Sequence, residues 1–104
     1  MRNFPLVLAG AALVAGGAQA APKHGHMAGA ELLPMAKVSL AAARTTALKA
    51  RAGAITDQEL EKERGGSGLR YSFDIKSGGK NYEVGVDART GKVLENKAEG
   101  RNPD

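Results

Sequence analysis

The segment LRYSFDIKS (residues 69–77), the pair Gly78-Gly79 and the segment KNYEVGVD (residues 80–87) decide the fold of this chain. Apolar and polar residues alternate along both segments, and this period of two is typical of a half-buried strand. Two adjacent glycines accept positive φ at both central positions of a two-residue hairpin turn. If Ser77 pairs with Lys80, the apolar residues meet on one face in the pairs Ile75–Tyr82, Phe73–Val84 and Tyr71–Val86. The sequence therefore predicts a hairpin with a single register, in which Arg70 lies opposite Asp87.

A helix is predicted before this hairpin, over residues 40–52. Ser39 is a suitable N-cap, the segment consists mostly of alanine, leucine and basic residues, and Gly53 stands where helices commonly end in the left-handed conformation. The apolar stripe of the helix is made mainly of alanines, so we expect the helix to lie close to a sheet.

Residues 55–64, between the helix and the hairpin, fit two structures. Thr56 followed by Glu59 resembles a capping box, and the neighbouring residues favour helix, so local propensity predicts a second helix. As an edge strand, the same segment would place Glu59, Glu61 and Glu63 on one face and Leu60 in the core, and the acidic edge would resist aggregation. The residues alone leave both structures open.

After the hairpin, residues 87–91 are predicted to form a turn with Gly91 at a position of positive φ, followed by a last strand. In the expected register Ala88 faces Lys92 and Leu94 faces Val86. We expect one domain over residues 38–99 and a disordered polar tail over residues 100–104.

The N-terminal residues have the pattern of a secretory signal peptide. Arg2 precedes an apolar stretch of about a dozen residues, and Ala18-Gln19-Ala20 is a small-x-small cleavage site, so cleavage is predicted after Ala20 and the expected location is periplasmic or secreted. A membrane-spanning helix needs roughly 20 apolar residues, so we expect no stable membrane insertion after cleavage. Residues 21–37 contain prolines, glycines and little periodicity, which predicts a flexible tether.

Composition argues against several classes of function. The chain has 15 basic and 11 acidic residues without a long run of like charges, and Tyr71, Phe73 and Tyr82 are placed in the predicted core, so we expect no nucleic-acid partner. There is no cysteine, which excludes a disulfide and a cysteine nucleophile. Both histidines lie in the predicted tether, so a catalytic triad would lack an ordered base, and we expect neither an enzyme nor a cofactor.

One cluster has metal-binding residue types. His24, His26 and Met27 are weak candidate ligands for copper, because secure sites usually need three or four ligands on an ordered frame. A small periplasmic metal-binding protein is therefore an alternative function.

The order of these features resembles the PepSY domain. The string VDARTGKV (residues 86–93) is the most specific element, and it is supported by Ala43, Ala47, the run Glu59-Leu60-Glu61 and the alternating hairpin strands. The resemblance implies an α+β fold with one helix packed on an antiparallel meander sheet of three to four strands, and it makes residues 55–64 a strand.

The resemblance also implies a function. PepSY domains are regarded as non-catalytic inhibitors or regulators of extracytoplasmic peptidases, so the implied partner is a protein such as a secreted metallopeptidase, with a sensory accessory role as an alternative. The candidate partner-binding residues are Glu59, Glu61, Glu63, Asp87, Arg89 and Thr90. Edge-strand and turn formation would also explain these residues.

Overall fold

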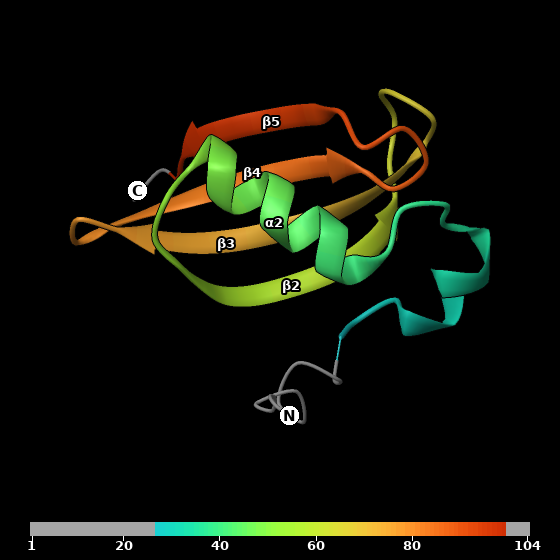
Figure 1. The fold of residues 1–104 in the computed structure, drawn as a ribbon, viewed down its shortest axis with the longest axis horizontal. Coiled ribbons are helices and arrows are strands. Elements are labelled where there is room, and N and C mark those ends of the chain that lie inside the picture. The colour runs from blue at the N-terminus through green and yellow to red at the C-terminus, as the bar shows by residue number, and fades with distance from the viewer. Residues whose placement is uncertain (1–26, 100–104) are drawn as a thin grey trace, which may run out of the picture.

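The computed structural model describes residues 27–99, so the predicted signal peptide, residues 21–26 and the predicted tail lie outside the described part. A short 3-10 helix, η1 (Ala30–Met35), and the helix α2 (Leu40–Ala50) precede four strands: β2 (Ala54–Lys62), β3 (Leu69–Ser77), β4 (Lys80–Asp87) and β5 (Val93–Ala98). The strands form one antiparallel meander in the order β2-β3-β4-β5, and α2 lies across one face of it (Figure 1). The predicted α+β fold is confirmed. Within residues 27–99, no helix is both long and apolar enough to cross a membrane.

The β3–β4 hairpin has the predicted register. Ser77 pairs with Lys80, Phe73 with Val84 and Arg70 with Asp87. Gly78 and Gly79 both have positive φ, 60° and 81°, as a two-residue turn of this kind requires. The alternation of apolar residues and the turn chemistry therefore specify the same pairing.

The core lies between α2 and the sheet. Ala43 and Ala47 are fully buried on the inner side of α2, and these small side chains let the helix approach the aromatic rings of Tyr71 and Phe73. The Ser39 hydroxyl accepts a hydrogen bond from the amide of Ala42 at 3.1 Å, which confirms the predicted N-cap. The Tyr71 hydroxyl donates to the carbonyl of Val38 at 2.7 Å, so the largest core residue also holds the chain that enters α2.

Residues 54–62 form a strand, as the resemblance implies and against their helical propensity. Leu60 is only 2% exposed on the face covered by α2, opposite Tyr71, while Glu59 pairs with Ser72 on the other face. A helix here would leave the main-chain groups on the outer edge of β3 without their β2 partners, so sheet pairing outweighs local propensity.

Two predicted details are wrong. Val86 pairs with Val93 rather than with Leu94, and Lys92 lies opposite Asp87 rather than Ala88, since the Asp87 amide donates to the Lys92 carbonyl at 2.8 Å. Leu94 is the extra residue of a bulge, and its side chain lies against Gly66. The helix α2 ends at Ala50, and Gly53 is not its left-handed cap. A Cβ atom at Gly53 would collide with the carbonyl oxygen of Lys76, so the glycine permits a close approach of two main-chain segments.

The structure also differs from the predicted flexible tether over residues 27–37. The Met27 side chain is 6% exposed and belongs to the core, and Ala28 forms a parallel bridge with Glu59 on the outer edge of β2. The amide of Leu60 donates to the carbonyl of Ala28 at 2.9 Å. Buried apolar contact and edge pairing hold a segment that has no periodic sequence pattern, and we call residues 27–35 the strap.

Candidate protein-binding face

The face of the sheet opposite α2, here called the open face, has a strongly acidic surface. No described helix lies on this face (Figure 1). Strand alternation and cross-strand pairing bring eight of the chain's eleven acidic residues to it: Asp57, Glu59, Glu61, Glu63, Asp74, Glu83, Glu95 and Glu99. The basic residues that share this face are Arg70, Lys76 and Lys97. The open face is therefore negative although the whole chain has a formal charge of +4.

The carboxylates of the open face are close enough to perturb one another. Partial burial raises the pKa of Asp74, and the nearby charges of Asp57, Glu83 and Glu59 raise it further. Partial burial likewise raises the pKa of Glu83, with additional repulsion from Glu95 and Glu99. A hydrogen bond shared with Asp74 raises the pKa of Glu99, and one shared with Glu61 raises the pKa of Glu63. Positive charge brought to this face would relieve the repulsion.

Arg70 lies near the start of β3, reaches across β4 on the open face and is almost buried there. Its guanidinium donates to a carboxylate oxygen of Glu95 at 3.3 Å and to the carbonyl of Arg64 at 3.0 Å. It passes over Gly85, where a Cβ atom would lie 3.2 Å from the guanidinium. Glu95 also forms an ion pair with Lys97 at 3.0 Å, so three charged side chains from β3 and β5 form a network that passes over β4. Among the described residues, the Nε of Arg70 is a buried donor without a hydrogen-bond partner.

Asp87 lies at the end of β4 and is fully buried. Its Oδ1 accepts hydrogen bonds from the Ser67 hydroxyl at 2.7 Å and from the amides of Arg89 and Thr90 at 2.8 and 3.0 Å, and its Oδ2 accepts from the amide of Ser67 at 2.6 Å. Burial alone would raise the pKa of this carboxyl, but these hydrogen bonds outweigh it and hold the pKa well below its usual range. Asp87 therefore joins the β2–β3 loop to the β4–β5 turn from inside the protein.

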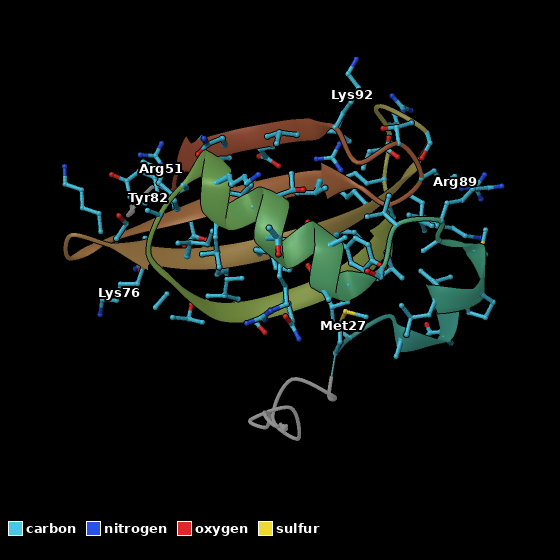
Figure 2. The ribbon with its side chains drawn as sticks, viewed as in Figure 1. Met27, Arg51, Lys76, Tyr82, Arg89 and Lys92 are labelled. Carbon is cyan, nitrogen blue, oxygen red and sulfur yellow. The ribbon has the colours of Figure 1, made fainter. Side chains whose placement is uncertain are left out.

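The structure separates the predicted partner-binding residues into three groups. Glu59, Glu61 and Glu63 lie together on the open face, although the Glu61 carboxylate already accepts a hydrogen bond from Ser72 at 2.9 Å. The exposed residues Arg89 and Thr90 lie in the β4–β5 turn, and Figure 2 shows Arg89 pointing outward there. The carboxylate of Asp87 is enclosed and cannot reach a partner without opening the turn.

The larger part of the open face was not predicted from the sequence. Its further carboxylates are Asp57, Asp74, Glu83, Glu95 and Glu99. The signal was present in the alternation, because the residues between the apolar positions of each strand include these carboxylates. Their gathering into one surface depends on the pairing of all four strands.

The predicted metal ligands are not brought together by the described residues. His24 and His26 lie outside the described part of the chain, and the Met27 side chain is packed in the core. Within residues 27–99, no group of three or more histidine, cysteine or acidic residues is arranged to hold a metal ion.

These features define a small α+β domain in which a single helix covers one face of a four-stranded antiparallel meander. A family model described as "Peptidase propeptide and YPEB domain", or PepSY, matches residues 37–97. The chain therefore belongs to the PepSY family. No curated protein and no solved structure matches it significantly.

Proposed function

We propose that this PepSY protein is a non-catalytic module that binds an extracytoplasmic peptidase and regulates its activity. The partner is a secreted metallopeptidase that presents lysine and arginine side chains to the open face. Membership of the family supports a propeptide-like role, and the predicted signal peptide supports the location.

The observation that carries the proposal is the segregation of charge. Among residues 27–99, eight carboxylates share one face of the sheet with three basic side chains, within a chain whose overall charge is positive. A surface of one sign steers an oppositely charged partner and orients it before contact. Cationic groups of a partner would relieve the repulsion between these carboxylates. They would also have few existing ion pairs on this face to break.

The test measures peptide hydrolysis by secreted metallopeptidases of the same organism, with the protein added at stoichiometric concentration. We expect one such peptidase to be slowed, and we expect binding to weaken steeply as salt is added, because exposed charges are screened within about 10 Å at 0.1 M ionic strength. Unchanged rates and no binding across these peptidases would refute the proposed function.

A matched pair of variants tests the open face itself. Glu59→Gln with Glu83→Gln removes two negative charges there, and we expect association at low salt to slow by roughly threefold to tenfold. Ala41→Lys with Thr45→Lys makes the same change in net charge at exposed positions of α2, on the other side of the molecule. Equal effects of the two pairs would show that only net charge matters.

A further inference from the structure

The two outer edges of the sheet differ. The strap pairs with the outer edge of β2 at one bridge, between Ala28 and Glu59. The outer edge of β5 pairs with no other described residue. An exposed edge offers unpaired main-chain donors and acceptors to another chain, and within residues 27–99 β5 offers them along its whole outer edge.

The hydrogen-bond phase of β5 shows which groups are available. The amide of Glu99 donates to the carbonyl of Asn81 at 2.9 Å, and Lys97 and Glu95 follow in the same phase opposite Glu83 and Gly85. Main-chain groups alternate in direction along an antiparallel strand. The amides and carbonyls of Asn96 and Ala98 therefore point away from β4, toward the open edge.

The charges of β5 select one way to use that edge. Glu95 and Lys97 lie on the open face, where their side chains form an ion pair at 3.0 Å. If two copies of β5 pair antiparallel about a twofold axis at Asn96, the outward groups of the two Asn96 residues bond each other, and each Glu95 faces Lys97 of the second copy. Such facing residues lie in a non-hydrogen-bonded position, where Cα atoms are about 4.5 Å apart and side chains interact most closely.

The neighbouring registers in the same hydrogen-bond phase are unfavourable. Moving the twofold axis to Glu95 places the two Glu95 side chains opposite each other, and moving it to Lys97 does the same for the two Lys97 side chains. Like charges directly opposite destabilise a strand pair, so this part of the strand favours the register centred on Asn96.

We propose that a second copy of this chain pairs with β5 in this register and forms a symmetric dimer with an eight-stranded sheet. The twofold axis is then perpendicular to the sheet, so both helices lie on one side and both open faces on the other. Each copy contributes carboxylates to one continuous acidic surface. Because β5 has only six residues, the interface is small and the dimer dissociates on dilution.

The experiment uses protein expressed from its complete coding sequence and purified in the form that the cell produces. Sedimentation velocity over a wide range of concentration should show a reversible monomer–dimer equilibrium, and the amides of Asn96 and Ala98 should exchange more slowly with solvent as concentration rises. Lys97→Glu should weaken the dimer by about tenfold or more, because both attractive pairs become repulsive. Lys92→Glu makes the same charge change at an exposed position outside β5 and should leave the equilibrium unchanged.

Two further variants separate pairing from folding. Ala98→Pro removes an outward amide that the chain's own sheet does not use, and it should abolish dimerisation while the thermal unfolding transition persists. Glu95→Lys and Lys97→Glu should each be monomeric alone and form a heterodimer when mixed, since both facing pairs are then attractive. Should Glu95→Lys fail to fold because Arg70 loses its acceptor, Lys97→Glu and Ala98→Pro still decide the question. A monomer at every concentration, or a dimer that both of these variants leave unchanged, would overturn the proposal.

Discussion

Replacing Asp87 by asparagine tests whether this buried carboxylate holds the two loops together. The substitution keeps Oδ1 and its three donors, from the Ser67 hydroxyl and the amides of Arg89 and Thr90. It replaces Oδ2 by an amide group that faces the Ser67 amide, so a hydrogen bond of 2.6 Å becomes a contact between two donors. Losing one charge-assisted bond costs about 2 kcal/mol, and weakening three others adds roughly 1 kcal/mol, so we expect the free energy of unfolding to fall by about 3 kcal/mol.

Urea denaturation followed by circular dichroism would measure this change, with Asp74→Asn as the matched control. Asp74 lies on the open face among other carboxylates, and neutralising it should cost less than about 0.5 kcal/mol because it relieves repulsion. A value for Asp87→Asn within about 0.5 kcal/mol of the wild type would refute the role of Asp87 as a structural clamp.

The pH dependence supplies an independent check with a defined sign. The pKa of Asp87 is lower in the folded protein than in the unfolded chain, so its contribution to stability is complete above about pH 4 and is lost as pH falls toward the folded value. The difference in stability between the wild type and Asp87→Asn should therefore narrow on acidification. A constant difference would contradict the lowered pKa.

Three other outcomes are expected. Gly29→Ala should detach the strap, because Gly29 has a φ of 85° and a Cβ atom there would collide with the Leu60 carbonyl. The Leu60 amide should then exchange faster with solvent in hydrogen-exchange measurements, and an unchanged rate would contradict the described contact. Arg51→Ala should lower the free energy of unfolding by about 1 kcal/mol, since the guanidinium lies 3.8 Å from the centre of the Tyr82 ring and donates to Asn96 at 3.2 Å (Figure 2). Arg51→Lys should lower it by less. A wild-type thermal stability for Arg51→Ala would be inconsistent with both contacts. Calorimetric affinity for a regulated peptidase should rise with pH through the titration of Asp74 and Glu83, whose raised pKa values keep part of the open face neutral in acid, and Glu83→Gln should flatten that profile.

The central hairpin could be predicted from sequence because its evidence is local. Alternation in β3 and β4 and the two glycines between them require one register, and the structure has that register. The predicted β4–β5 register is wrong by one residue, because Leu94 forms a bulge and its side chain lies against Gly66, nearly thirty residues earlier. When a bulge residue packs against a loop that is distant in sequence, the alternation of apolar and polar residues around it does not reveal the bulge.

The strap and the full extent of the open face could not be predicted from the sequence, for related reasons. The strap is held by one buried methionine and by pairing to the edge of β2, and neither feature produces amphipathic periodicity. Glu59, Glu61 and Glu63 were found because they are close in sequence, whereas Glu83 and Glu99 reach the same surface only through the complete meander. Local charge patterns therefore located one border of the acidic surface and could not give its extent.

The strap also bears on whether copies of this protein can associate beyond a dimer. Sheets grow into fibres when each unit offers two free edges, because every added chain then presents a new edge to the next. In the proposed dimer, pairing through β5 is isologous and uses the β5 edges of both copies, so the remaining edges are those of β2, where Ala28 bridges to Glu59. Loss of the strap would expose this second edge as well, so we expect a variant without the contact between Gly29 and Leu60 to assemble beyond dimers.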